Sequence, residues 1–157
     1  LIELNQKLNT TYLGFGRGAE AGKKAQESAD RASSQVGGAP AAAARAEAKA
    51  KDAYGNSGWD LVDAAKRRDF DLSKVTKEEL PAEMREMDAE QRKAHLEKKA
   101  AERKTVQDEI NKLGRERQAF IDDELKKAPK KDGAFDEAVR STLRNQAEKK
   151  GFTFEKK

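Results

Sequence analysis

A glycine-rich segment near the N-terminus comes closest, in residue types and spacing, to a known chemistry. Gly14, Gly16 and Ala19 satisfy the pattern G-x-G-x-x-[G/A] between an expected strand and an expected helix. Such a turn can present backbone N–H groups and a helix N-terminus to a pyrophosphate. A dinucleotide site also needs a strand after that helix, with an acidic residue near its end. Here residues 37–40 (Gly-Gly-Ala-Pro) lead into another helix instead. We therefore predict a flexible elbow over residues 14–18 rather than a nucleotide site.

Other residue types that commonly do chemistry lack the neighbours that the chemistry requires. His95 is the single histidine and lies among charged residues on an expected helix, which predicts a solvated surface position. The carboxylates at 122–124 are consecutive, so on a helix they point in different directions, unlike the ligands of a calcium loop. The chain has no cysteine, which excludes disulfides, thiolate catalysis and Cys-ligated metals. These patterns predict a non-enzymatic protein with no cofactor, no metal site and no catalytic residue.

Two lysine-rich clusters suggest an alternative function, weak binding of nucleic acid or of an anionic surface. They comprise Lys126, Lys127, Lys130 and Lys131, and Lys149, Lys150, Lys156 and Lys157. The whole chain has 33 basic and 29 acidic residues, a net charge of only +4. Nucleic-acid binders usually gather their basic residues on one face, whereas most basic clusters here have an acidic residue within a helical turn. Protein partners are therefore the leading expectation.

The composition favours extended helices over one compact globule. Hydrophobic residues make up 36% and charged residues 39% of the chain, against typical values of about 45–50% and about 25%. A large single core would gain little from so few apolar side chains. No apolar run reaches the roughly 20 residues needed to span a bilayer.

The first 56 residues predict a helix, a short strand and an Ala-rich helical hairpin. Leucines 1, 4 and 8 have helical spacing, and residues 11–15 (Thr-Tyr-Leu-Gly-Phe) favour a strand. Two stripes of small residues follow on either side of the break at residues 37–40. Their members are Ala21, Ala25, Ala29, Ala32 and Val36, then Ala42, Ala46, Ala50 and Ala53. We expect the two stripes to pack as an antiparallel hairpin, with Tyr12 or Trp59 helping to cover it.

Short elements are expected over residues 57–87. Ser57 and Asp60 form a capping-box pattern that opens a helix over 58–66, and Thr76 with Glu79 forms a second one. Trp59 is the single tryptophan, and two interpretations stay open: the anchor of a small local core, or a contact for a partner. An extended connector lies between them, fixed to a neighbouring surface by Phe70, Leu72 and Val75.

The longest expected element is a helix over residues 89–128, capped by Asp88 and Gln91 and roughly 60 Å long. Its second half carries a short coiled-coil seam made by Val106, Ile110, Leu113 and Phe120. Arg103, Arg117 and Glu124 fall at seam positions that should be apolar, which weakens a free coiled coil. We expect this helix to pack on another helix of the chain, for which the stripe Phe135, Val139, Leu143 and Ala147 is the candidate. Residues 152–154 are interpreted as a second strand, on one sheet with residues 13–15.

Several of these segments resemble the C-terminal region of bacterial proteins that contain a von Willebrand factor A-type (VWA) domain. Residues 4–12 (LNQKLNTTY) look like the last helix and strand of that domain, and three further segments resemble the helical region behind it. These are 59–64 (WDLVDA), 70–75 (FDLSKV) with 79–81 (ELP), and 146–154 (QAEKKGFTF). The resemblance implies an adhesion module upstream of Leu1 and a weak preference for the cell envelope or an exported location. VWA domains bind partners through a metal held by Asp-x-Ser-x-Ser, which this chain lacks, so no metal site is carried over.

The sequence therefore predicts a mainly α fold of extended helical hairpins with one long helix. A short strand near each end would complete the sheet of an α/β VWA-like domain. The expected parts are residues 1–16 (end of that domain), 17–56 (hairpin), 57–87 (short helices and connector) and 88–157 (long helix, loop, C-terminal helix and strand). The expected function is a protein-interaction scaffold whose partner is another protein, its own upstream domain or a second copy. The candidate partner-binding residues are Val106, Ile110, Leu113, Phe120 and Trp59.

Overall fold

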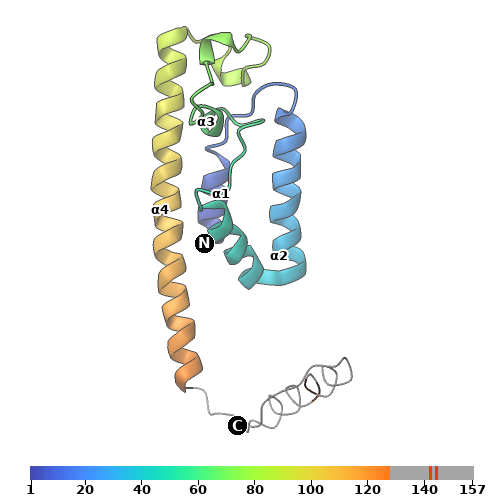
Figure 1. The fold of residues 1–157 in the computed structure, drawn as a ribbon, viewed down its shortest axis with the longest axis vertical. Helices are drawn as coiled ribbons and strands as arrows, with labels where there is room; N and C mark the ends of the chain where they lie inside the picture. The colour runs from blue at the N-terminus through green and yellow to red at the C-terminus, as the bar shows by residue number, and fades with distance from the viewer. Residues whose placement is uncertain (128–141, 143, 145–157) are drawn as a thin grey trace. The chain divides into compact units, whose positions relative to one another are not determined.

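The computed structural model describes residues 1–127, 142 and 144, and this part of the chain is mainly helical (Figure 1). It divides into two compact units, Leu1–Gln118 and Ala119–Lys157. The elements are α1 (Ile2–Asn9), α2 (Ala19–Lys49), α3 (Leu61–Ala64), the 3-10 turns η1 (Leu72–Lys74) and η2 (Ala82–Met84), and α4 (Ala89–Lys127). Among the helices of the described residues, none is long and apolar enough to cross a membrane.

The strand expected over residues 11–15 is wrong. The segment makes a single isolated antiparallel bridge, Gly14 to Asp60. Around it, the Phe15 amide donates to the Trp59 carbonyl (2.8 Å) and the Leu61 amide donates to the Leu13 carbonyl (2.9 Å). The ladder cannot extend because Gly16 turns the chain with φ of 67° and α3 begins at Leu61. The described residues therefore contain no sheet of a VWA-like domain, and residues 152–154 lie outside them.

The expected break at residues 37–40 is present within α2, which consists of two helical arms. Gly38 interrupts the helix with φ of 64° and ψ of −160°, and the ribbon bends sharply there (Figure 1). Backbone in this region is essentially restricted to glycine. We call residues 19–37 the first arm and residues 39–49 the second arm. Pro40 lies in the first turn of the second arm, where its missing N–H is tolerated.

Only one of the two predicted small-residue stripes faces the interior. Ala42, Ala46 and Ala50 are buried, whereas Ala53 is exposed. The stripe expected on the first arm is wrong, because Ala29 alone is partly buried. Its other members are exposed: Ala21, Ala25, Ala32 and Val36. The inward face of the first arm instead carries Gly22, Gln26 and Asp30, because its contacts are polar rather than apolar.

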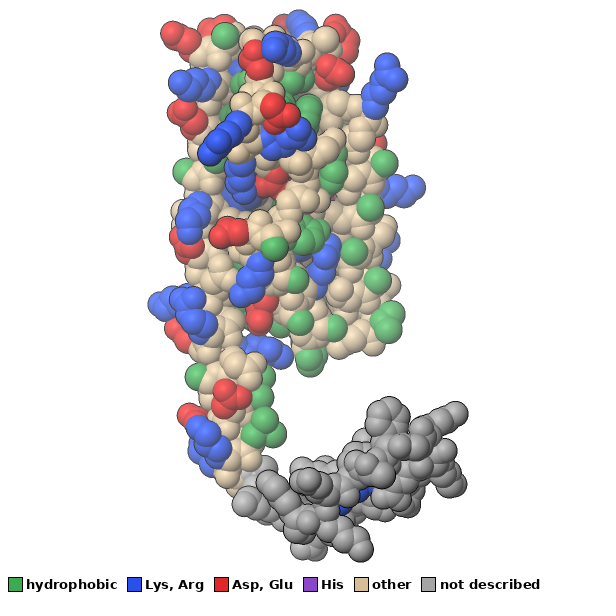
Figure 2. Space-filling model, in the orientation of Figure 1, with side chains coloured by type: hydrophobic (Ala, Val, Ile, Leu, Met, Phe, Trp, Pro, Cys, Tyr) green, Lys and Arg blue, Asp and Glu red, His purple; other side chains and the backbone are tan. Residues whose placement is uncertain are grey.

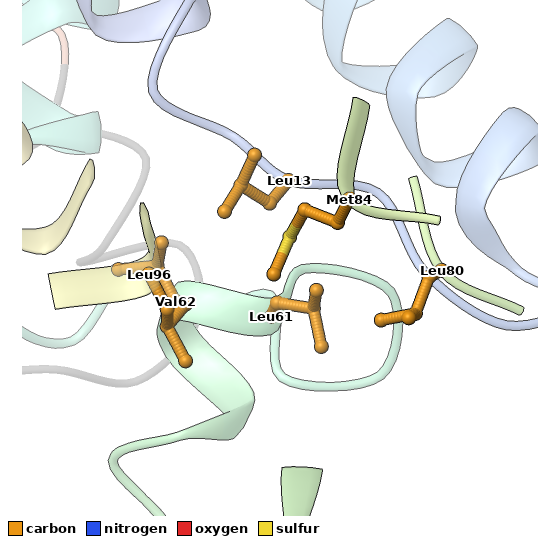
Figure 3. Packing of buried hydrophobic residues seen from close by; sticks show 6 residues of the cluster. All are labelled: Leu13, Leu61, Val62, Leu80, Met84 and Leu96. Carbon is orange, nitrogen blue, oxygen red and sulfur yellow. The ribbon is translucent and has the colours of Figure 1, made fainter. Parts of the chain in front are cut away.

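Two hydrophobic clusters hold unit Leu1–Gln118 together. Figure 3 shows the buried members of the first, which gather from α3, α4 and the connecting segments; they are Leu13, Leu61, Val62, Leu80, Met84 and Leu96. The second joins α1 and the end of α2 to α4, through Leu4, Leu8, Ala46, Ala50 and Ile110. The expected intrachain packing of the long helix is therefore present over 96–113. The stripe expected to be its partner, Phe135, Val139, Leu143 and Ala147, lies outside the described residues.

Local capping signals predicted some element ends and missed others. The Asp88 amide donates to Gln91 Oε1 (3.0 Å) and the Gln91 amide donates to Asp88 Oδ1 (2.8 Å), so the expected cap of α4 is confirmed. The expected helix over 58–66 is wrong: α3 is a single turn that begins after Asp60, whose side chain accepts from the Asp63 amide. The expected extended connector contains the turn η1, since Asp71 caps Ser73. Its three apolar residues do pack on the first hydrophobic cluster.

Candidate functional site

The candidate partner-binding residues occupy three different environments. Ile110 is fully buried, and Val106 and Leu113 pack beside it against the second hydrophobic cluster. These three form one contact inside the chain. Phe120 is 67% exposed and belongs to the second compact unit. Trp59 belongs to neither of these environments.

Trp59 lies between the N-terminal segment and the first arm. Its ring stacks on Tyr12 with centroids 5.6 Å apart. A methyl group added at Gly22 would lie only 2.4 Å from the Trp59 ring. The close approach of ring and helix therefore depends on glycine at this position, and Trp59 covers the hairpin as the sequence predicted.

Arg103 is the centre of the most deeply buried charge cluster. Its guanidinium donates from Nη1 to Asp60 Oδ2 (2.6 Å) and from Nη2 to Asp60 Oδ1 (3.0 Å), a bidentate pair. Nε donates to Thr11 Oγ1 (3.1 Å), Nη2 donates to the Thr11 carbonyl (2.7 Å), and Nη1 lies 3.2 Å from Asp63 Oδ1. The side chains of Arg103 and Asp60 are 2% and 0% exposed. The guanidinium also lies 4.2 Å from the Tyr12 ring centroid, a cation–π contact.

Asp60 links this cluster to the backbone. One carboxylate accepts from Arg103, from the Leu13 amide (2.8 Å) and from the Asp63 amide (3.0 Å). Burial lowers the pKa of Arg103, but the hydrogen bond and charge of Asp60 outweigh it and hold that pKa above its usual value. The cluster therefore joins α4, the start of α3 and the segment after α1 at one point. Of these members, the sequence had singled out Arg103 only as a defect of the seam, and that interpretation is wrong.

A second charge cluster surrounds Asp30 on the first arm. Asp30 Oδ2 accepts from Lys49 Nζ (2.7 Å), Asn9 Nδ2 (2.8 Å) and Asn5 Nδ2 (3.1 Å). Its other oxygen, Oδ1, accepts from Arg45 Nε (3.0 Å). The Lys49 side chain is fully buried, while those of Asp30 and Arg45 are 11% and 20% exposed. The cluster thus joins both arms of α2 to α1.

A chain of amides and hydroxyls continues the Asp30 cluster toward Trp59. Gln26 donates to Asn9 Oδ1 (3.2 Å) and accepts from the Tyr54 hydroxyl (3.2 Å) and from Asn56 Nδ2 (3.4 Å). Tyr54 in turn accepts from Arg45 Nη2 (2.8 Å). Buried polar groups generally need such partners. The two polar side chains on the inner face of the first arm, Gln26 and Asp30, both have them.

Burial and charge act in opposite directions on the two ionised groups of this cluster. Burial raises the pKa of Asp30, but its hydrogen bonds to Lys49 and Asn9 dominate, and the pKa lies below its usual value. Burial also lowers the pKa of Lys49, and the bond to Asp30 offsets this only in part. Asp30 is therefore stabilised as a carboxylate, whereas Lys49 carries its charge at a cost.

Two backbone amides of the glycine pattern, which could bind a phosphate, donate hydrogen bonds to other parts of the chain instead. The Phe15 amide donates to Trp59 and the Gly16 amide donates to the Glu79 carbonyl (2.9 Å). The elbow over residues 14–18 is thus tied to two neighbouring segments. His95 lies within 3.1 Å of Glu83 and is 21% exposed, so it is less solvated than expected. Within the described residues no group of three His, Cys, Asp or Glu side chains could hold a metal ion.

Both described lysines of the first predicted cluster are paired with acidic neighbours on their own helix. Lys126 pairs with Asp123 (3.2 Å) and Lys127 pairs with Glu124 (2.9 Å). On the face shown in Figure 2, basic and acidic side chains of the described residues are interspersed. The remaining lysines of both predicted clusters lie outside the described residues.

The sequence pointed to neither charge cluster as a site. Asp60 was singled out for its capping position, and that signal identified its bond to the Asp63 amide but not its bonds to Arg103. Asp30 and Lys49 carry no local signal of burial, since charged residues are mostly solvated. Comparisons of this chain with protein-family models, with curated proteins and with solved structures found no match.

Proposed function

We propose that the chain is a non-enzymatic helical scaffold, an extension of a bacterial VWA-type domain that mediates protein–protein contacts. The observation that carries the proposal is the Arg103 cluster, which ties α4 to segments 43 and 92 residues away along the chain. A bidentate guanidinium–carboxylate pair has a fixed geometry. It therefore fixes the register of α4 against α3 and the N-terminal segment, as a rigid brace requires.

Apolar packing on both sides of Arg103 supports the same role. Leu96 packs into one hydrophobic cluster and Ile110 into the other. One face of a single helix thus joins two cores, with the ion pair between them. This arrangement holds α4 against both bending and sliding. Sliding of α4 would leave buried charges without partners, and bending would open one of the hydrophobic clusters.

The association with a VWA-type domain rests on the sequence resemblance alone. The candidate contact for a protein partner is the part of α4 in the second unit, where Phe120 and Leu125 are 67% and 68% exposed.

A distance measurement tests the rigid brace. Because the chain has no cysteine, Glu3→Cys and Glu116→Cys introduce two unique spin-label sites, both exposed and both within the first unit. Double electron–electron resonance should give one narrow distance distribution, which Arg103→Met broadens and the exposed control Lys104→Met does not. A broad distribution in the chain with native Arg103 would refute the brace.

Size exclusion with light scattering tests the contact surface. If Phe120 contributes to an assembly, Phe120→Asp should lower the measured mass without loss of helicity. Ile110→Asp, in contrast, should unfold the first unit, because it places a charge in the second hydrophobic cluster. Unchanged helicity and stability in Ile110→Asp would contradict the packing on which the scaffold depends.

A further inference from the structure

The first arm of α2 is attached to the molecule differently from the other helices. Among the described residues, neither hydrophobic cluster has a member from residues 19–37. The arm contributes instead a glycine, an amide and a carboxylate, at positions i, i+4 and i+8 of one helical face: Gly22, Gln26 and Asp30. Hydrogen bonds and ion pairs, rather than burial of apolar surface, hold this face down.

Each of these three residues contacts side chains that lie beneath the arm. Gly22 lies against the Trp59 ring. Gln26 bonds to Asn9, Tyr54 and Asn56, and Asp30 bonds to Lys49, Arg45, Asn5 and Asn9. The surface therefore offers, in order along one helix length, an aromatic ring, a set of amide and hydroxyl groups, and two cations.

The two cations make this surface selective for an acidic helix. Lys49 and Arg45 both pair with the single carboxylate of Asp30, so the site below the arm has an excess of positive charge. Beneath a helix without an acid, the buried ammonium of Lys49 would keep only Asn9 Oδ1 and the Tyr12 ring as partners and would have no carboxylate, which is unfavourable. A helix that is neutral or basic at this position cannot replace the arm.

Glycines flank the arm at both ends. Gly16 and Gly38 have φ of 67° and 64°, and a methyl group at Gly37 would lie 2.2 Å from the Ala41 side chain. Glycine has little resistance to a change of backbone direction. These two glycines mark the turns at which the arm begins and ends, and neither hydrophobic cluster of the described residues depends on a side chain of the arm.

We propose that the groove beneath the first arm is a binding site for an acidic helix of a protein partner. The partner helix carries a small residue, an amide and a carboxylate at i, i+4 and i+8. The first arm occupies this groove as an intramolecular substitute for that helix. The groove is lined by Tyr12, Trp59, Asn9, Lys49, Arg45 and Tyr54. This inference goes beyond the scaffold role, because it concerns the hairpin and not the contacts of Arg103 or Phe120.

Competition with the tethered arm sets the affinity that a partner needs. A segment linked to its own site has an effective concentration in the millimolar range. The wild-type chain should therefore bind a partner helix weakly until its own arm is loosened, and removing the carboxylate of Asp30 should expose the groove.

A peptide of the arm's own sequence, residues 19–37, is the probe. A hydrocarbon staple between positions 24 and 28, both exposed, keeps it helical without altering the inward face. By fluorescence anisotropy, the full chain with Asp30→Ala should bind this peptide at least about tenfold more tightly than the wild-type chain does. Glu27→Ala is the matched control, because Glu27 is an exposed acidic residue of the same arm, and it should behave like the wild type.

The outcomes separate the proposal from its alternatives. A stapled peptide that itself carries Asp30→Ala should not bind. Equal binding of both peptides would show that the groove does not require a carboxylate, and would overturn the proposal. No binding to the Asp30→Ala chain would overturn the groove. Cooperative loss of all helicity in that chain would also overturn the proposal, since the arm would then be inseparable from the fold.

Hydrogen exchange on the wild-type chain gives a second, independent test. Amides of residues 19–37 should exchange through a local opening, while amides of α4 over 96–110 stay protected. Exchange of the arm only together with α4 would refute a separable arm.

Discussion

The Arg103 cluster and the Asp30 cluster both bury charge, yet they hold the molecule together in different ways. Arg103 and Asp60 lie between two hydrophobic clusters, are almost fully buried and also bond to the backbone. Asp30 joins neighbouring helices through side chains alone, at the edge of the second cluster, and stays 11% exposed. The comparison teaches that a buried ion pair acts as a part of the core when apolar packing flanks it. We therefore call the Arg103 cluster the clamp, and the Asp30 cluster, which lacks such packing, the latch.

Removing the guanidinium should give the largest effect, because it leaves Asp60 as a buried charge without its partner. We expect Arg103→Met to lower the free energy of unfolding by about 3–5 kcal/mol, measured by urea denaturation followed by circular dichroism. Asp60 cannot move toward solvent to reduce this loss, since its carboxylate also accepts from the Leu13 and Asp63 amides.

Lys104→Met is the matched control, because Lys104 is the next residue of α4 and its side chain is 71% exposed. Its effect should stay within about 0.5 kcal/mol. Equal effects of the two substitutions would remove the distinction between core and surface charge on this helix.

Truncating Ile110, in the second hydrophobic cluster, should have the next largest effect. Ile110→Ala deletes a fully buried side chain that packs among Leu4, Leu8, Ala46 and Ala50. We expect a loss of roughly 3 kcal/mol, from lost burial and from the cavity left behind, by the same urea titration. Phe120→Ala, at a side chain that is 67% exposed, should change the free energy of unfolding by less than about 1 kcal/mol.

The long helix and the second arm could be predicted from the sequence because their signals are local. Asp88 and Gln91 lie three residues apart and cap the helix that they begin. The stripe Ala42, Ala46 and Ala50 has helical spacing and small side chains, which pack closely against any helix. Neither pattern depends on contacts with residues that are distant in the sequence.

The two charge clusters could not be predicted because their partners come from distant segments. Periodicity treats Arg103 as a break in an apolar seam, and only its meeting with Asp60 makes burial of the charge favourable. In the same way, the first arm packs through Gly22, Gln26 and Asp30, while its alanine stripe faces solvent. Residue type alone does not tell a solvated charge from one that is matched in the fold.

A methyl group at Gly22 should sharpen the comparison by loosening the latch and sparing the clamp. Alanine favours a helix over glycine by about 0.8–1 kcal/mol, but here its Cβ would lie 2.4 Å from the Trp59 ring. Overpacking of this kind costs about 1–3 kcal/mol, so the expected net effect of Gly22→Ala is a loss of about 1 kcal/mol. Fluorescence of Trp59, the single tryptophan, should shift toward that of an exposed indole.

Gly55→Ala is the control for this substitution, since nothing lies within 4 Å of a methyl group there. It should leave the tryptophan spectrum unchanged. A gain of stability in Gly22→Ala would mean that helix propensity outweighs the contact with Trp59, and the latch would then not depend on close approach.

The smallest effect is expected from acid, which should act on the latch through Asp30. Although burial raises its pKa, the hydrogen bonds from Lys49 and Asn9 keep the pKa of Asp30 below 3.8, its ordinary value. The unfolded chain therefore binds the proton more tightly, so the stabilisation is complete above pH 3.8 and is lost as the pH falls through the folded-state pKa. As the pH falls below 3.8, the stability advantage of the wild type over Asp30→Asn should shrink. Hydrogen exchange should detect this loss first in residues 19–37. If acid opened α4 over 96–110 before the first arm, the weaker of the two clusters would be the Arg103 cluster, and the assignment of clamp and latch would have to be reversed.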